Sequence, residues 1–506
     1  MNAAGRAAGS VAPLGAAPRI EHCDVAIVGG GMVGASLALA LANLPLEVVV
    51  IEAIPPDADG QPSFDARTTA LSNGTRRIFG GLGLWDELAR EATPIRRIHV
   101  SDRGRFGATR LDAAEQGVPA LGYVLENRLL GAALWRRLKA LPRTRLWTPA
   151  EVGALAIEAD HVVLSVQRRA EAVAGQAGGE AGRRTAAGRA ARGGAPGGAQ
   201  VVLHARLVVA ADGAGSVVRR ESGVAADRWD YGQTAIIANV VAERFHEHVA
   251  YERFTPTGPL ALLPAADGRC VVVWTLAPAA ATRALGLDEA TFLTELQRCF
   301  GWRLGRFTKV GMRHAYPLAL TRAEAQSAAR VAIIGNAAQG LHPIAGQGFN
   351  LGLRDAATLA EVIAQEIGDR AAGVAVAATA GEGALRGAAD PGSEAVLARY
   401  ADWRRADRHA LIAFTDGLVR LFGSPFAPVR AARGLGLVLF DLSATAKTAL
   451  SRLSLGFAGR LPRLARGLPL VAPSAPGARA PVAAGGSAGP PGASLPAAGG
   501  RIAAAP

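Results

Sequence analysis

A glycine-rich segment between two runs of β-branched residues constrains the fold of this chain most strongly. Gly29, Gly31 and Gly34 form a G-x-G-x-x-G motif that follows the buried-strand pattern CDVAIV and opens a helical stretch. Such glycines allow a tight turn and let the backbone approach a pyrophosphate at the helix N-terminus. The next β-rich run, LEVVVIE, ends at Glu52, whose carboxylate can accept hydrogen bonds from ribose hydroxyls. The pattern predicts a βαβ unit that binds a dinucleotide, and the acid favours NAD or FAD over NADP.

Further β-rich runs indicate a second domain. QTAIIANVV, GPLALLP and CVVVWTL, at 233–241, 258–264 and 270–276, are separated by turn residues and predict an antiparallel sheet. The buried-strand pattern returns in VAIIGNAA, residues 331–338, and the stretch from 350 to 367 has helical periodicity. The C-terminal part is helical as well. The fold class is therefore α/β, with an added antiparallel sheet and a helical C-terminal region.

Four segments contain few large apolar side chains. Three of them, the leader, the first insertion and the tail, are predicted to be disordered because they cannot bury enough surface to offset the entropy of ordering, and the remaining one interrupts two helical regions. The second of them lies between β-rich runs at 161–167 and 200–210, so we expect it at the tip of a hairpin. These segments are a leader over 1–20, a disordered insertion over 170–200, a low-complexity insertion over 371–393 and a tail over 471–506.

Charge and cysteine content exclude several classes of protein. The chain has 55 Lys and Arg against 42 Asp and Glu, a net charge of +13, but the arginines are scattered, so we predict no nucleic-acid partner. Three distant cysteines without metal-ligand spacing predict a reducing compartment and no metal site. No stretch of about 18–20 apolar residues predicts a membrane span. We expect a cytoplasmic protein.

Three stretches carry a resemblance to a known family: DARTTALSNGTRRIFGGLGLWDEL (65–88), GYVLENRLL (122–130) and LHPIAGQGFNLGLRD (341–355). They resemble the single-component flavin aromatic hydroxylases of the para-hydroxybenzoate hydroxylase class. Within that class the chain is most similar to the ubiquinone-biosynthesis hydroxylases, in particular the 2-polyprenyl-6-methoxyphenol hydroxylases. The resemblance covers about 23–467 apart from the two insertions.

The resemblance implies a domain organisation. A Rossmann-like FAD-binding domain over 21–370 would be interleaved with an antiparallel-sheet substrate domain, at about 90–125 and 225–315. A C-terminal helical region would follow over 394–470.

The resemblance also implies a site for non-covalent FAD. Arg67 and Arg128 would lie near the flavin side of the cofactor, where a guanidinium can pair with pyrophosphate oxygens, although both can also be ordinary surface arginines. Asp212 and Gly213 match an Asp-Gly motif linked to FAD and to the nicotinamide donor, and a plain helix N-cap is the alternative. The ADP half of FAD would be held by Gly29, Gly31, Gly34 and Glu52.

The loop 335–348 would contact the flavin itself. Asn336 stands where the wider class has an Asp that binds the ribitol chain, and this departure favours the 6-methoxyphenol branch. His342 is a candidate catalytic base, with a structural histidine as the alternative, and Pro343 beside it is the second candidate for the catalytic part of the site. The loop residues that would face the isoalloxazine ring are His342, Pro343, Gly346, Gln347 and Gly348.

The implied reaction is hydroxylation of a polyprenylated phenol in ubiquinone biosynthesis, by O2 activated as a flavin C4a-hydroperoxide and with NADH or NADPH as a transient donor. A flavin-dependent reductase or dehydrogenase of an isoprenoid or quinone, and a non-catalytic flavin-bound scaffold, are the alternatives. A ubiquinone-biosynthesis complex is an expected partner. Residues 411–470 carry a net charge of +6 among apolar residues, which predicts peripheral contact with the inner face of a membrane, unless these helices pack on the core.

Overall fold

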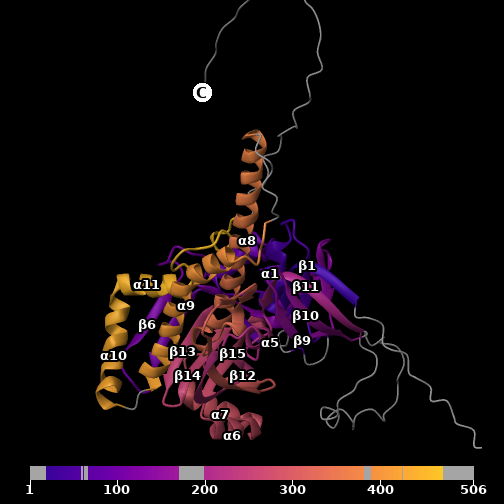
Figure 1. The fold of residues 1–506 in the computed structure, drawn as a ribbon. Coiled ribbons are helices and arrows are strands. Elements are labelled where there is room, and N and C mark those ends of the chain that lie inside the picture. Colours follow the sequence, from indigo (N-terminus) through magenta and orange to yellow (C-terminus); the bar gives the residue numbers. More distant parts are fainter. Residues whose placement is uncertain are drawn as a thin grey trace, which may run out of the picture. The chain divides into compact units, whose positions relative to one another are not determined.

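The computed structural model describes most of the chain as an α/β body with two large sheets, one small sheet and C-terminal helices (Figure 1). The leader up to 18, the insertion 170–198 and the tail from 471 fall outside the described residues, so the interpretation of these segments stays a prediction. The described residues are 19–57, 61, 67–169, 199–380, 389–423 and 426–470.

The first sheet contains the predicted βαβ unit. β1 (Arg19–Val28) pairs in parallel with β2 (Val48–Ile51) and with β11 (Ala199–Ala210), and α1 (Met32–Leu41) connects β1 to β2. Alternate residues of β1 face two apolar cores, because successive side chains of a strand point to opposite sides. The remaining strands are β8 (Thr144–Trp147), β9 (Ala150–Ile157), β10 (Val162–Arg168), β18 (Ser327–Ala328) and β19 (Val331–Ile333).

The flanks of the first insertion lie together, as predicted. β10 and β11 pair antiparallel, and their register places Arg168 opposite Ala199. The residues on either side of 170–198 are therefore neighbours, so the insertion connects two strands of one hairpin.

The second sheet belongs to the predicted substrate domain. It runs in the order β20, β17, β12, β15, β14, β13, β5, β6, with β16 on β12, and only β13 and β5 pair in parallel. Its last long strand continues to Ala323, beyond the predicted boundary near 315. The strands are β5 (Arg97–Asp102), β6 (Ala108–Asp112), β12 (Ala226–Ala242), β13 (Val249–Thr255), β14 (Gly258–Pro264), β15 (Arg269–Leu276), β16 (Phe307–Val310), β17 (His314–Ala323) and β20 (Gln339–Gly340).

A third, small sheet is built from strands that lie between β2 and β8 in sequence, and helices pack around all three sheets. β7 (Gly122–Glu126) pairs with β3 (Thr68–Ser72) and with β4 (Thr93–Ile95). The helices on the first core include α1, α4 and α8, and those on the second sheet include α6 and α7. The shorter helices are α2 (Asn73–Gly81), α3 (Trp85–Leu88), α4 (Asn127–Lys139), α5 (Val217–Glu221), α6 (Pro278–Gly286) and α7 (Glu289–Phe300).

The second predicted insertion is wrong in its first part. α8 runs from Gln347 to Ala380, so residues 371–380 are helical. The physical reason is composition: alanine is the best helix former, and an alanine-rich stretch continues a helix that a packed first half has nucleated. Residues 381–388 fall outside the described residues.

The C-terminal region is helical as predicted, and it packs on the body. α9 (Glu394–Gly423) contacts α8, and α10 (Ala427–Leu442) contacts β5 and β6. α11 (Ala444–Ser454) follows α10, and Figure 1 shows these yellow helices beside the substrate sheet.

Candidate active site

The glycine loop fits closely against its neighbours. Gly29 has φ +103°, and a Cβ there would lie 2.4 Å from the carbonyl oxygen of Ala211. A Cβ on Gly34 would lie 2.0 Å from the carbonyl oxygen of Gly29. Gly31 is the N-cap of α1 and provides no side-chain cap, so the first N–H groups of the helix remain available to a phosphate.

Glu52 lies beside this loop at the end of β2. Its Oε2 accepts a hydrogen bond from the Gly30 N–H at 2.6 Å, and its Oε1 accepts one from the Ile54 N–H at 3.0 Å. Burial raises the pKa of Glu52, while these N–H groups act in the opposite direction. Trp135 of α4, which the sequence analysis did not single out, donates from Nε1 to the Gly30 carbonyl at 3.0 Å. The loop and its acid thus form a rigid unit suited to the ADP half of FAD.

The two predicted flavin-side arginines lie in different surroundings. Arg67 lines the large cavity described below and lies over the Tyr316 ring at 4.8 Å. Arg128 forms a 2.6 Å ion pair with Glu126 at the surface and is not among the cavity-lining residues. The structure therefore brings only Arg67 into the cavity, and the role of Arg128 stays a prediction.

Asp212 holds the start of α5. Its Oδ2 accepts from the Val217 N–H at 2.8 Å, and its Oδ1 accepts from the Ser216 hydroxyl. The N-cap residue itself is Ser216, so Asp212 supports the helix start from outside it, and its role at the cofactor stays a prediction. Gly213 has φ +85°, so the turn favours glycine, and the next residues, Ala214 and Gly215, line the cavity.

Beneath Asn336 lies a buried ionic cluster that the sequence analysis missed. Asn336 is exposed towards the cavity, whereas Asp355 is buried below it. Asp355 accepts hydrogen bonds from the Gly335 N–H at 3.2 Å, from Gln339 Nε2 at 2.6 Å and from Arg404 Nε at 2.7 Å. One carboxylate of α8 thereby fixes the turn that carries Asn336.

The cluster is balanced by a second acid. Asp407 pairs with Arg404 at 2.6 Å and with Arg354 at 2.9 Å. Burial on its own raises the pKa of Asp407, but the two guanidinium groups outweigh it, and the pKa is lowered. Two arginines and two aspartates therefore lock α8 to α9 below the flavin loop.

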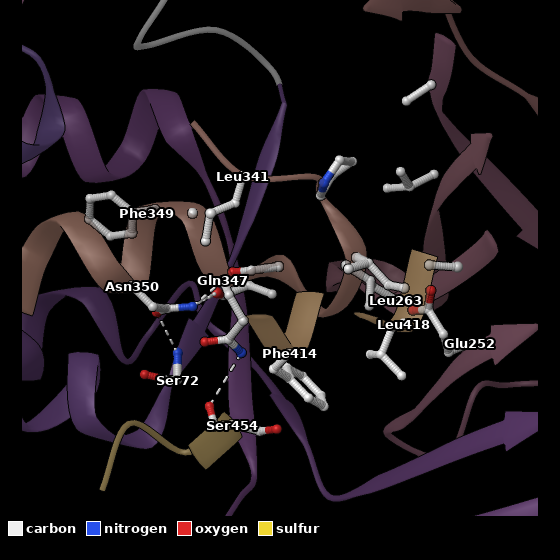
Figure 2. A pocket seen from close by; sticks show the side chains of 18 of the residues that line it. Ser72, Glu252, Leu263, Leu341, Gln347, Phe349, Asn350, Phe414, Leu418 and Ser454 are labelled. Carbon is white, nitrogen blue, oxygen red and sulfur yellow. Dashed lines mark hydrogen bonds between the residues drawn. The ribbon is translucent and has the colours of Figure 1, made fainter. Parts of the chain in front are cut away.

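Asn350 holds the start of α8 in place. Its Oδ1 accepts from the Ser72 N–H at 2.8 Å and from the Thr75 hydroxyl at 2.7 Å. Its Nδ2 donates to the carbonyl groups of Ala70 and Gly346 at 2.9 and 2.8 Å. Figure 2 shows this amide beside Ser72, with Gln347 pointing to Ser454. All hydrogen-bonding positions of the Asn350 side chain are used within the loop, so the loop is rigid.

The structure does not bring His342 to the cavity wall, although its neighbours Leu341 and Pro343 lie there. Its Nδ1 accepts from the Ile344 N–H at 3.2 Å, and its Nε2 lies 3.3 Å from Gln233 Oε1. Burial lowers the pKa of His342 to about 4, so the ring is neutral near pH 7. Both nitrogens contact groups within the protein, which agrees with the structural alternative, and the role of His342 as catalytic base stays a prediction.

A cavity of about 1440 Å³ joins the two domains and the C-terminal helices. This exceeds the range of about 300–1,000 Å³ that is common for small-molecule sites. The flavin loop forms one wall with Asn336, Pro343, Gly346, Gln347 and Gly348. The substrate sheet and the helices α9, α10 and α11 form the others, mostly with apolar side chains.

The C-terminal arginines lie in different surroundings, and the membrane contact expected of them stays a prediction. Arg433 is buried, lines the cavity and lies 3.8 Å from Asp102 Oδ2. Arg420 forms a 2.7 Å ion pair with Asp416 and lies over the Trp229 ring. Apolar side chains of these helices line the cavity, so the helices pack on the body, while Arg452, Arg460 and Arg466 are exposed.

A family model described as FAD binding domain matches residues 22–379. Over 452 residues the chain is 38% identical to ubiquinone hydroxylase UbiL of Rhodospirillum rubrum, covering 88% of this chain and 93% of that protein. The chain belongs to the FAD-dependent ubiquinone hydroxylases. This hydroxylase is also 33% identical to 3-demethoxyubiquinol 3-hydroxylase of Escherichia coli, over 86% of this chain and 99% of that protein. The family predicted from the sequence is confirmed, and the ring position that would separate its branches stays a prediction.

Solved structures show the same fold. p-Nitrophenol 4-monooxygenase PnpA from Pseudomonas putida DLL-E4 matches the hydroxylase with a TM-score of 0.64 at 20% identity, over 87% of this chain and 99% of that chain. CabE, an aromatic hydroxylase from angucycline biosynthesis, matches with a TM-score of 0.58 at 20% identity, over 87% of this chain and 76% of that chain. The predicted fold class is confirmed.

The residues of this hydroxylase fit FAD. The glycine loop leaves no space for side chains, α1 begins without a side-chain cap, and Glu52 lies at the end of β2. When FAD is bound, its ADP half would lie against Gly29, Gly31, Gly34 and Glu52. Its isoalloxazine ring would lie against the loop 341–348. The enzyme is therefore an FAD-dependent monooxygenase. No helix in the described part of the chain is both long and apolar enough to cross a membrane.

Proposed function

We propose that this hydroxylase inserts one oxygen atom into the aromatic ring of a polyprenylated phenol, using O2 and electrons from NADH or NADPH. The observation that carries the proposal is the cavity of about 1440 Å³, whose polar loop wall faces apolar walls. A flavin ring and a phenol head suit the loop end, and an isoprenoid tail suits the apolar surfaces. The names of the relatives support this substrate class.

The chain's own residues perform three tasks in this reaction. When bound, reduced FAD supplies the activated oxygen atom. The N-terminus of α8, at Gln347 and Gly348, turns N–H groups towards the part of the cavity where negative charge develops. Asn350 keeps this helix end in position, so that no reorganisation is needed during turnover. The apolar walls exclude water that would otherwise divert the oxygen into hydrogen peroxide.

The test is isotope incorporation by the FAD-loaded enzyme. A farnesylated phenol, NADH or NADPH in parallel, and ¹⁸O2 should give a hydroxylated product that carries one labelled oxygen. A reductase or dehydrogenase would convert the substrate without label, and a scaffold would not oxidise the nicotinamide in response to the phenol. Either result would refute the proposal.

We also propose peripheral contact with a membrane, through the outer face of α10. Leu435, Leu439 and Leu442 are spaced by four and three residues and are 60%, 58% and 77% exposed. Phe426, just before α10, is 63% exposed. Such a contiguous apolar face suits the interfacial layer of a bilayer that holds the lipid-tailed substrate.

Co-sedimentation with lipid vesicles tests the contact. Replacing Leu435, Leu439 and Leu442 by serine should reduce the bound fraction several-fold while FAD content is unchanged. Leu468→Ser, which changes an exposed leucine outside α10, is the matched control. Equal binding of the triple variant and the control would exclude this face.

A partner complex follows from the same substrate chemistry. A polyprenylated intermediate stays in lipid, so direct transfer between the enzymes of one pathway avoids its dilution. We propose that the hydroxylase associates with other ubiquinone-biosynthesis proteins. Size-exclusion analysis of the native protein in a detergent extract should place it in a fraction larger than its monomer, and elution as the monomer would refute this.

A further inference from the structure

One side chain of the cavity has no role in the site described so far. Glu252 lies near the middle of β13 and lines the cavity together with Ala250 and Phe254, which alternate with it on the same face of the strand. Its partners across the sheet are Ala261 on β14 and Val100 on β5, both without polar side chains. The carboxyl therefore lies in apolar surroundings.

The position of Glu252 relates it to the flavin loop. Figure 2 shows it in the same part of the cavity as Leu263 and Leu418, across from Gln347 and Asn350. Phe254, two residues further along β13, stacks on Phe422 of α9, and both belong to an apolar cluster with Ile344 of the flavin loop. The sheet that carries Glu252 and the loop that would hold the ring are thus fixed relative to each other.

Glu252 has no partner of its own in the described part of the chain: no side chain or backbone group forms a hydrogen bond or ion pair with it. Burial alone raises its pKa to about 7. A carboxyl placed in an apolar wall without a hydrogen bond costs free energy, and none of the residues that the structure describes offsets this cost. Glu252 is half-buried, and a polar group of this kind in the wall of a ligand cavity points to a group on the ligand.

Among the described residues that line the cavity, Glu252 is the one carboxylate. The arginines that line the cavity belong to other segments of the chain, and no ion pair joins any of them to Glu252. The other ionisable side chains that line the cavity are Arg67, Arg219, Arg228, Tyr251, Tyr316 and Arg433. A neutral substrate with an O–H donor is therefore the natural partner for this carboxylate.

We propose that Glu252 is a catalytic residue that accepts the hydrogen bond of the substrate's phenolic hydroxyl and takes its proton while the ring is hydroxylated. This rests on the proposed function, since it requires a phenol in the cavity. A phenol that has given up its proton is more electron-rich and attacks an electrophilic oxygen more readily. A carboxyl whose pKa is near 7 is suited to a base at neutral pH.

The proton is returned within one turnover. Glu252 takes the phenolic proton as the new carbon–oxygen bond forms. The ring carbon then loses its hydrogen as a proton, which is consumed as the second oxygen atom of O2 becomes water, and the ring oxygen regains a proton from Glu252. O2 contributes one oxygen atom to the ring and one to water, and NADH or NADPH supplies the two electrons. Glu252 therefore leaves the cycle in its starting state.

Equilibrium binding separates this role from a structural one without any turnover. The probes are a farnesylated phenol and its O-methyl ether, added to FAD-loaded enzyme in the absence of nicotinamide. At pH 8 the wild type should prefer the phenol by about tenfold or more, the usual range for a hydrogen bond to a charged group. The preference should fall as the pH drops below about 7, the pKa of Glu252.

Two variants complete the binding test. Glu252→Gln keeps a hydrogen-bonding side chain but has no charge, so its preference for the phenol should be smaller and independent of pH. Glu252→Leu should show no preference. If both variants keep the wild-type preference and its pH dependence, the proposal is wrong.

Steady-state turnover provides a second test of the same proposal. Glu252→Gln should lower the rate of product formation by about 10²–10⁴-fold, the range for loss of a general base, while the phenol's KM changes far less. Oxidation of the nicotinamide should continue and yield hydrogen peroxide. Full product formation by the variant would overturn the role of Glu252, whereas lack of product with the wild type would overturn the proposed function instead.

Discussion

The half-buried carboxyl of Glu252 should make the stability of this hydroxylase depend on pH in a way that one substitution removes. The pKa of Glu252 is raised from an ordinary 4.5 to about 7 by burial. A group whose pKa is raised on folding contributes its stability fully below the unfolded value and loses it as the pH rises through the folded value. The wild type should therefore lose stability relative to Glu252→Leu between about pH 4.5 and 7.

The magnitude follows from the same two pKa values. Their difference corresponds to about 3 kcal/mol in the free energy of unfolding. We take this as an upper limit, because water in a cavity of this size solvates the charged form in part. For about 400 ordered residues, the entropy of unfolding near 60 °C converts about 3 kcal/mol into about 4 °C of thermal midpoint.

The assay is thermal unfolding of the FAD-loaded, substrate-free protein, followed by flavin fluorescence at a series of pH values. The midpoint of Glu252→Leu minus that of the wild type should grow by up to about 4 °C as the pH rises from about 4.5 to above 7. Glu324→Leu, a substitution of an exposed glutamate, is the matched control and should show no such growth. The reasoning would be refuted if the difference between the two midpoints did not change with pH. It would also be refuted if the wild type became more stable relative to Glu252→Leu as the pH rose.

Three further outcomes are expected. Gly34→Ala, which places a Cβ 2.0 Å from the Gly29 carbonyl oxygen, should lower FAD content and the thermal midpoint, whereas Gly80→Ala, with open space around its Cβ, should change neither. Asp355→Asn should cost about 3–5 kcal/mol of stability, measured by chemical unfolding, because it leaves the cluster with uncompensated positive charge. Replacing 170–198 by a short Gly/Asn turn should leave flavin content and the midpoint unchanged, and a large loss would show that the insertion packs or binds something.

The nucleotide half of the site could be predicted from the sequence because its signals are local. Gly29, Gly34 and Glu52 belong to one strand–turn–helix–strand unit, and the spacing along the chain already fixes their arrangement. The same holds for the helical C-terminal region, whose periodicity is visible in the sequence. Residues 371–380 show the limit of such signals. The low-complexity stretch predicts an interruption between two helices, but it is rich in alanine, which is also a good helix former, and the first helix continues through it.

The substrate half could not be predicted because its neighbours are distant in sequence. Glu252 is one polar residue in a β-rich run, and its isolation is visible only when Val100, Ala261 and α9 surround it. Asp355 lay within a recognised motif, but its contacts with Gln339 and Arg404 depend on tertiary packing. For His342, the residue type suggested catalysis, and only the geometry of the loop showed that both nitrogens are occupied.

The last prediction concerns salt, and it follows from where the C-terminal charges lie. The net charge of +6 over 411–470 led us to expect an electrostatic contact with anionic lipid. Charge that is paired or buried attracts lipid weakly, and Arg420 is paired while Arg433 is buried beside Asp102. The exposed leucines of α10 would instead contribute through burial of apolar area, which salt does not screen. Retention on vesicles should therefore change little as salt rises, and should be similar on neutral and anionic lipid. Release at moderate salt would show that other basic residues carry the contact, and α10 would then not be the membrane-binding face.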